Sequence, residues 1–330
     1  VPGNHEYDYG MDNFLSLAKD VANYPYISAN FTYKDEHVFA PYVVKEFDGV
    51  KIAFVGITTP KTITSSTPAY FQDEEGNFIY GIAGRESGSA LYEAVQKAID
   101  EAKAAGATKV IALGHLGDDL SSRPWTSEET IANVSGLDAF IDGHSHSVVE
   151  GKEVADKDGN KVVLTQTGQY FDRIGMMVID AESGEITTDF IECKEILAED
   201  NETVEGYELC SDIYAGTELI ADTEVQKIKD AWITEIDTML GQKVGVAEVV
   251  LDNYDAEGKR MVRGKETNTG DFCADALYYL FDDMDMDVDV GIMNGGGIRN
   301  KAVTGDITYK ICKNIHTFGN VACLQTVSGQ

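Results

Sequence analysis

Four of the six histidines lie in short motifs that are flanked by glycine. These motifs are Gly3-Asn4-His5-Glu6, Gly114-His115-Leu116-Gly117 and Gly143-His144-Ser145-His146. His144 and His146 are two residues apart in a segment that we expect to be extended, so their imidazoles can project to the same side and share one site. Imidazole nitrogens and the amide oxygen of Asn suit Zn, Mn or Fe rather than Ca. The residue types and spacing therefore favour a transition-metal site.

The simpler alternative is that three unrelated loops each carry histidine. A histidine in a protein core gains nothing from flanking glycines, and the presence of all three motifs in one chain favours the shared site. Cysteine offers no competing site, because the five cysteines are scattered and contain no C-x-x-C pair.

The motifs also give the chain a family resemblance. The segment Gly3-Asn4-His5-Glu6-Tyr7-Asp8 and the two later histidine motifs resemble the last three sequence blocks of the calcineurin-like binuclear metallophosphoesterases. Two further blocks resemble the C-terminal domain of the secreted 5′-nucleotidase family: Arg263-Gly264-Lys265-Glu266-Thr267-Asn268 and Asn294-Gly295-Gly296-Gly297-Ile298-Arg299. The blocks span nearly the whole chain in family order, and their combination is more specific than any single one.

The resemblance implies which residues would hold metal. It makes Asn4, His115 and His144 ligands of one ion and His146 a ligand of the other. The implied cofactors are two divalent ions, Zn, Mn or similar, which lie about 4 Å apart in such sites. Such a pair lowers the pKa of a bound water and holds a phosphate for in-line attack.

The same resemblance assigns His5 and Asp8 a catalytic role rather than a ligand role. In the family the histidine of this motif contacts the phosphoryl group and stabilises its developing charge, and Asp8 would orient that imidazole. An imidazolium at this place adds positive charge where the equatorial phosphate oxygens need it.

The resemblance implies a substrate site in the C-terminal part. Arg263 and Arg299 would grip the anionic part of a nucleotide, and Asn294 and Asn320 would add hydrogen bonds. Glycines before Arg299 would let the ligand approach the backbone closely. Phe318 would be one of two aromatic rings that sandwich the base. A single Phe is more often a core residue, so its assignment depends on the resemblance.

The motifs need elements that position them. Apolar runs predict buried strands over 51–57, 109–114 and 137–142, and the last two end at Gly-His pairs. Helical spacing of apolar residues predicts a helix over 89–105, and further strands are expected over 161–167, 174–180 and 185–192. Loops at strand ends carry the chemistry of α/β proteins, so the histidines are in the right place for a site.

The second half of the chain is expected to begin with an acidic, irregular segment over 195–221. A capping box of Thr223 and Gln226 predicts the start of a helix that joins two domains. Beyond it we expect a strand over 244–251, a helix over 270–281, a strand over 288–293 and a further α/β element from 307.

The predicted fold class is α/β, layered α+β. Residues 1–221 would form a calcineurin-like metallophosphoesterase β-sandwich flanked by helices. Residues 222–242 would be the linking helix, and residues 243–330 the 5′-nucleotidase C-terminal substrate-binding domain, of the α/β nucleotide-binding type. Each of the two domains is expected to be incomplete.

The chain departs from the family pattern at both ends. The family opens with a strand ending in Asp-x-His and a strand ending in Gly-Asp, and this chain begins almost at the Asn-His block that follows them. Three family ligands, the second aromatic ring and the acidic residue of the base pocket are therefore missing from the pattern. We expect the chain to be an internal fragment of a longer enzyme.

Charge and hydropathy limit the partners and the location. The chain has 26 Lys plus Arg against 57 Asp plus Glu and a formal net charge of −31, which argues against a nucleic acid polymer as partner. No run reaches the roughly 18 apolar residues of a membrane span. The acidity suits an extracellular, cell-surface or periplasmic protein, and we expect a signal peptide before residue 1. The oligomeric state stays open.

The predicted activity is metal-dependent hydrolysis of nucleoside 5′-monophosphates to nucleoside and phosphate, with UDP-sugars as further substrates. Such an enzyme is a phosphoric monoester hydrolase. One alternative is a 2′,3′-cyclic-nucleotide 2′-phosphodiesterase/3′-nucleotidase. An alternative of another class is an inert fragment that binds nucleotide weakly through Arg263, Arg299 and Phe318.

Overall fold

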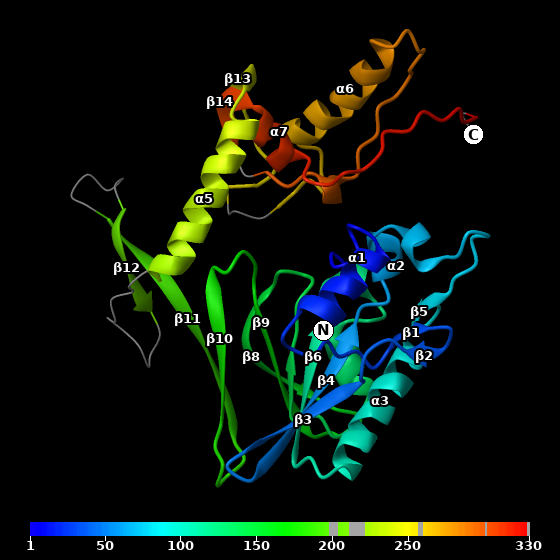
Figure 1. The fold of residues 1–330 in the computed structure, drawn as a ribbon, viewed down its shortest axis with the longest axis vertical. Helices are drawn as coiled ribbons and strands as arrows, with labels where there is room; N and C mark the ends of the chain where they lie inside the picture. Colours follow the sequence, from blue (N-terminus) through cyan, green and yellow to red (C-terminus); the bar gives the residue numbers. More distant parts are fainter. Residues whose placement is uncertain (198–203, 211–221, 257–259, 301, 329–330) are drawn as a thin grey trace. The chain divides into compact units, whose positions relative to one another are not determined.

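A computed structural model describes residues 1–197, 204–210, 222–256, 260–300 and 302–328. The chain divides into two compact units, Val1–Leu219 and Ile220–Gln330. Figure 1 shows the course of the chain through both units.

A six-stranded mixed sheet forms the centre of the N-terminal unit, with the order β3-β4-β6-β7-β9-β8. Its inner strands β4, β6, β7 and β9 are parallel, and the edge strands β3 and β8 run antiparallel to their neighbours. The strands are β3 (Tyr42–Phe47), β4 (Val50–Thr58), β6 (Lys109–His115), β7 (Ala139–Ile141), β8 (Val148–Ala155) and β9 (Lys161–Thr167). Parallel strands end at a common edge, so the loops after β6 and β7 are neighbours.

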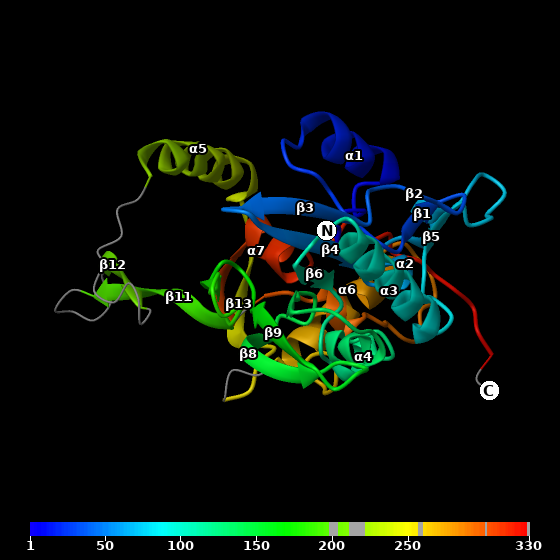
Figure 2. The same cartoon turned by 90° about the horizontal axis from the view of Figure 1, so that it is seen from below.

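Two helices cover one face of this sheet, α3 (Gly88–Ala104) and α4 (Ser127–Asn133). The apolar residues that predicted α3 recur at helical spacing, and all but the half-buried Ala94 are buried: Leu91, Val95, Ala98, Ile99 and Ala102. They share a core with apolar residues of β4 and β6. Figure 2 shows α3 and α4 on the same side of the sheet.

A second, antiparallel sheet covers the other face. It has the order β10-β11-β12 and consists of β10 (Arg173–Ile179), β11 (Ile186–Leu197) and β12 (Val204–Cys210). Ile52, Ile111 and Ala139 of the central sheet form a buried cluster with Met177 and Ile186 of the second sheet. The predicted β-sandwich flanked by helices is therefore confirmed, and Figure 1 shows its layers from β11 to α3.

A small aromatic subdomain carries the N-terminal motif. It contains α1 (Met11–Ser16), α2 (Thr62–Ser65) and the sheet β2-β1-β5, formed by β1 (Phe31–Tyr33), β2 (Glu36–His37) and β5 (Tyr80–Ile82). Tyr7 is fully buried, with its ring centroid 5.0 Å from those of Phe14 and Phe71. This packing anchors the loop that presents Asn4 and His5.

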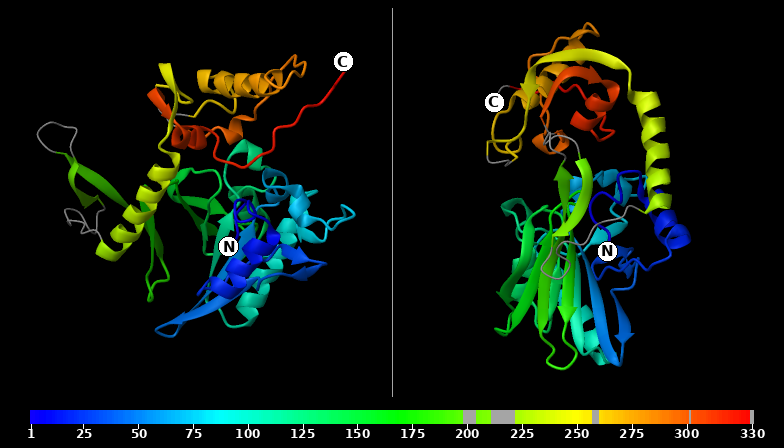
Figure 3. Two further views of the ribbon diagram at one scale, coloured as in Figure 1. Left: turned by 45° about the horizontal axis from the view of Figure 1, so that its top comes forward. Right: turned by 90° about the vertical axis from the view of Figure 1, so that its left-hand side faces the viewer.

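The C-terminal unit combines helices with a two-stranded antiparallel sheet (Figure 3). Its elements are α5 (Thr223–Leu240), β13 (Lys243–Leu251), α6 (Asn268–Asp282), β14 (Val303–Thr308) and α7 (Tyr309–Ile315). Cys273, Ile298 and Ile315 are its buried core cluster. Across the described parts of the chain, no helix is both long and apolar enough to cross a membrane.

Two predictions about residues 195–226 are wrong. The segment expected to be irregular continues β11 to Leu197 and contains β12, while residues 198–203 and 211–221 lie outside the described residues. A strand in a sheet with one solvated face tolerates many charged residues, so the acidity of this segment did not exclude a strand.

Asp222 caps α5, because its carboxylate accepts hydrogen bonds from the backbone N–H groups of Glu224 and Val225. Asp is at least as good a cap as Thr, so the expected Thr223 box does not form.

The prediction of a strand over 288–293 is also wrong. The described residues give this segment no strand pairing, because β13 pairs with β14 instead. Val290 and Ile292 are 69% and 81% exposed. This apolar run therefore forms no strand, because no neighbouring strand among the described residues pairs with it.

Candidate active site

Three donor atoms from distant parts of the sequence meet in the N-terminal unit. Oδ1 of Asn4 lies 3.0 Å from Nε2 of His115 and 3.0 Å from Nδ1 of His144. His115 ends β6, and His144 lies in the loop after the neighbouring strand β7. The ring centroids of the two histidines are 5.1 Å apart. An amide oxygen and two imidazole nitrogens thus converge on one point.

Glycines allow these loops to approach so closely. A Cβ added at Gly3 would lie 2.8 Å from Cε1 and Nε2 of His115, and one added at Gly143 would lie 3.2 Å from Nδ1 of the same ring. The imidazole of His115 is therefore packed between the backbones of the other two motifs. This packing explains why the histidine motifs carry glycine.

The protonation state of His115 suits metal binding. Burial, and then the positive charge of the neighbouring His144, His5 and His146, lowers the pKa of His115 to about 3. The ring is therefore neutral near pH 7, and a neutral imidazole has the lone pair that a metal ion needs. Because His144, His5 and His146 all lower this pKa, the four motif histidines lie near one another.

A buried carboxyl group holds the His115 loop. Asp142 accepts hydrogen bonds from the backbone N–H groups of Leu116 at 2.8 Å and Gly117 at 3.0 Å. Burial raises the pKa of Asp142 to about 6, although these hydrogen bonds oppose the shift. Asp142 was not among the residues predicted from the sequence. Its signal was an Asp that follows a buried strand and directly precedes Gly-His.

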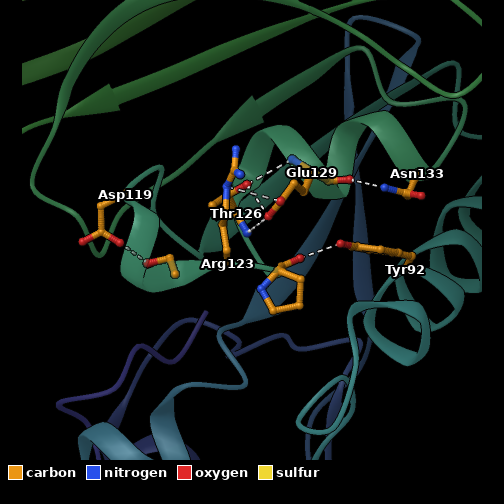
Figure 4. A network of polar contacts seen from close by, with 8 residues as sticks. Tyr92, Asp119, Arg123, Thr126, Glu129 and Asn133 are labelled. Carbon is orange, nitrogen blue, oxygen red and sulfur yellow. Dashed lines mark hydrogen bonds and ion pairs between the residues drawn. The ribbon is translucent and has the colours of Figure 1, made fainter.

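The segment that leaves the His115 loop is fixed by polar contacts, which Figure 4 shows. Thr126 and Glu129 form a reciprocal capping box at the start of α4. The hydroxyl of Tyr92 donates to the carbonyl of Pro124, and the backbone N–H of Ser127 donates to the carbonyl of Gly117. The loop is thereby tied to both helices of that face.

His5 and Asp8 form a separate pair. Nδ1 of His5 lies 2.8 Å from Oδ2 of Asp8, and their side chains are 48% and 28% exposed. The buried Tyr7 lies between them in the sequence and fixes this turn. The contact of Nδ1 with the Asp8 carboxylate fixes the orientation of the His5 ring.

His146 follows His144 by two residues and has an exposed side chain. Its backbone is left-handed, with φ 61°, and its ring centroid lies 6.5 Å from that of Tyr170. Within the described ranges, no three His, Cys, Asp or Glu side chains gather into a metal-binding group. The donor set that the geometry offers is Asn4, His115 and His144, and its chemistry fits one divalent transition-metal ion with open positions.

The C-terminal candidates form two local groups. A Cβ added at Gly296 would lie 3.3 Å from Nδ2 of Asn294 and 3.4 Å from a guanidinium nitrogen of Arg263. Cζ of Arg299 lies 5.0 Å from the ring centroid of Phe318, within cation–π range. Phe318 is half-buried and does not belong to the core cluster of this unit. Asn320 is exposed, two residues beyond Phe318.

Comparison with known proteins shows which proteins the chain resembles. Residues 243–330 match the family described as 5′-nucleotidase, C-terminal domain. Over 350 residues the chain is 26% identical to the 5′-nucleotidase of Vibrio parahaemolyticus, an alignment that covers 99% of the chain and 58% of the relative. The chain is thus similar to the 5′-nucleotidases along nearly its whole length.

Two further known proteins resemble the chain. The trifunctional nucleotide phosphoesterase YfkN of Bacillus subtilis is 29% identical over 364 residues, covering 99% of the chain and 22% of the relative. The solved 5′-nucleotidase precursor of Thermus thermophilus has the same fold, with a TM-score of 0.66 at 21% identity over 96% of the chain and 57% of that structure. The chain thus spans about a fifth to three fifths of the length of these proteins.

Proposed function

We propose that this chain carries a metal site and part of the nucleotide site of an enzyme that hydrolyses nucleoside 5′-monophosphates to nucleoside and phosphate. The observation that carries the proposal is the convergence of Asn4, His115 and His144 at the loop edge of the sheet. The family match over residues 243–330 and the relatives named 5′-nucleotidase support the reaction class.

The proposed cofactors are two divalent ions, Zn or Mn. When bound, such a pair supplies a water of lowered pKa and holds the phosphate oxygens. Asn4, His115 and His144 would hold one ion, and His146 would belong to the other. The neutral His115 ring needs no deprotonation before it binds metal.

His5 would act on the phosphoryl group directly. The Asp8 carboxylate accepts a hydrogen bond from Nδ1 of His5 and would hold the imidazole in place. The half-exposed imidazole would then donate a hydrogen bond to a phosphate oxygen. This hydrogen bond would strengthen as negative charge builds up on that oxygen, which is how a fixed cationic donor lowers the barrier.

The nucleotide would be held by the C-terminal unit. Arg263 and Arg299 supply the cationic groups, Asn294 and Asn320 the amides, and Phe318 a ring face for the base. We also propose the division into 1–221, 222–242 and 243–330 for the metal domain, linking helix and nucleotide domain. An exported protein fits the acidic composition.

The test is phosphate release by the native protein, purified with any sequence that flanks residues 1–330. We expect phosphate from AMP with added Mn²⁺ or Zn²⁺ and none after chelation with EDTA. UDP-glucose and 2′,3′-cyclic AMP are assayed in parallel. Faster cleavage of 2′,3′-cyclic AMP than of AMP would replace the proposed substrate class with 2′,3′-cyclic nucleotides. Nucleotide binding without metal retention or phosphate release would support an inert binding protein instead.

A further inference from the structure

The loop that carries His144 and His146 has an unfavourable backbone. Both residues have a left-handed conformation, with φ of 82° and 61°. A residue with a Cβ pays roughly 1–2 kcal/mol for this conformation. Two such residues, separated only by Ser145, require contacts from outside the loop to stay in place.

Gln166 provides such contacts. It lies on β9, opposite Val149 of β8, and its side chain is only 2% exposed. Its Oε1 accepts a hydrogen bond from Oγ of Ser145 at 2.9 Å and another from the backbone N–H of Ser147 at 3.0 Å. Ser145 and Ser147 are the two residues that flank His146, so one buried oxygen holds both ends of that turn.

Asp118 completes the arrangement from the opposite side. Oγ of Ser147 donates to Oδ1 of Asp118 at 2.6 Å, and the backbone N–H of Asp118 donates to Oγ of Ser145 at 3.3 Å. Asp118 follows the His115 loop, so these bonds join the two histidine loops. Oγ of Ser145 is therefore shared between the Gln166 and Asp118 contacts.

We infer that Gln166 is a positioning residue that fixes the left-handed His144–His146 loop in the shape that binds metal. Gln166 does not touch the donor atoms itself and acts through Ser145 and Ser147. The metal part of this inference rests on the proposed function. Residues behind metal ligands commonly change metal affinity by 10- to 100-fold when they are replaced.

The test compares Gln166→Met with Gln166→Glu and with the control Thr165→Val. Met has nearly the same shape but no comparable acceptor, whereas Glu keeps an oxygen for both donors. The control removes another buried hydrogen bond of β9, from Oγ1 of Thr165 to the carbonyl of Val149, without touching the histidine loop. Calorimetric titration with Mn²⁺ measures affinity, and hydrogen exchange of the metal-free proteins measures protection of amides 144–147.

We expect Gln166→Met to weaken Mn²⁺ binding by about tenfold or more and to speed exchange at amides 144–147. Gln166→Glu and Thr165→Val should keep wild-type values of both. Equal behaviour of Gln166→Met and Thr165→Val would overturn the inference. If Gln166→Met does not fold, Ser145→Ala removes one of the two hydrogen bonds to Gln166 from the loop side and should produce the same two effects. Failure of the wild type to bind Mn²⁺ would reject the metal site, and the exchange data would still decide the role of Gln166.

Discussion

The amide oxygen of Asn4 lies 3.0 Å from Nε2 of His115, although 111 residues separate them in the chain. The contact joins the aromatic subdomain to the end of the central sheet. His144 reaches the same oxygen from a third loop. A site of this kind exists only in the folded unit, so metal binding and folding are expected to be coupled.

Replacing His5 by Asn should separate catalysis from metal binding. We expect kcat for AMP to fall by about 10²- to 10³-fold, the cost of losing one donor to a developing negative charge. Metal content, measured by plasma mass spectrometry, should not change, because His5 faces Asp8 and not the Asn4 oxygen. His37→Asn is the matched control, an exposed histidine on β2 outside the motifs. Loss of metal in His5→Asn would contradict the role proposed for His5.

Replacing Arg263 by Ala should weaken substrate binding. A hydrogen bond to a charged group is worth about 1.5–3 kcal/mol, so we expect KM for AMP to rise roughly 10- to 100-fold. Arg85→Ala is the control, because Arg85 is exposed and stacks on Phe78 in the other unit. If both variants changed KM equally, the effect would reflect overall charge and not a nucleotide site.

Replacing Asp222 by Ala should destabilise α5. The carboxylate accepts hydrogen bonds from two otherwise unpaired backbone N–H groups at the helix start, and loss of such a cap costs about 1 kcal/mol. Urea unfolding followed by circular dichroism measures the change in the free energy of unfolding. Thr223→Ala should leave it unaltered. A larger loss of stability in Thr223→Ala than in Asp222→Ala would support the Thr223 capping box instead.

The cysteines should differ in their reaction with iodoacetamide. Burial raises the pKa of Cys273 to about 11, so its thiol remains protonated at pH 8, and only the thiolate reacts. Peptide mapping by mass spectrometry at pH 8 should find Cys193 and Cys323 modified, because both are exposed, and Cys273 intact. A pH above about 11 or unfolding in urea should make Cys273 reactive. Rapid modification of native Cys273 at pH 8 would show that its site is open.

The parts of the fold that were predictable have a local signal. The buried face of α3 follows from the helical spacing of its apolar residues, and the strands β4 and β6 follow from short apolar runs. Residues 288–293 have the same kind of apolar run, but whether a strand forms depends on a partner that periodicity does not specify. The prediction of the capping residue of α5 was wrong for a similar reason, because the adjacent residues Asp222 and Thr223 could each cap the helix.

The site was predictable where residue type carried the signal. Amide and imidazole groups in glycine-flanked motifs indicate metal chemistry, and the family resemblance singled out Asn4, His115 and His144 among them. Asp142 and Gln166 were not selected, because the backbone N–H groups that they bind are brought to them only by the folded loops. Supporting residues of this kind resemble ordinary polar residues at strand ends.

The most direct measurement is anomalous X-ray scattering from crystals of the native protein grown with Mn²⁺. We predict an anomalous peak within coordination distance of Asn4 Oδ1, His115 Nε2 and His144 Nδ1, the three atoms that already converge. The absence of a peak there at saturating Mn²⁺, or a peak bound only by other side chains, would contradict the proposed metal site.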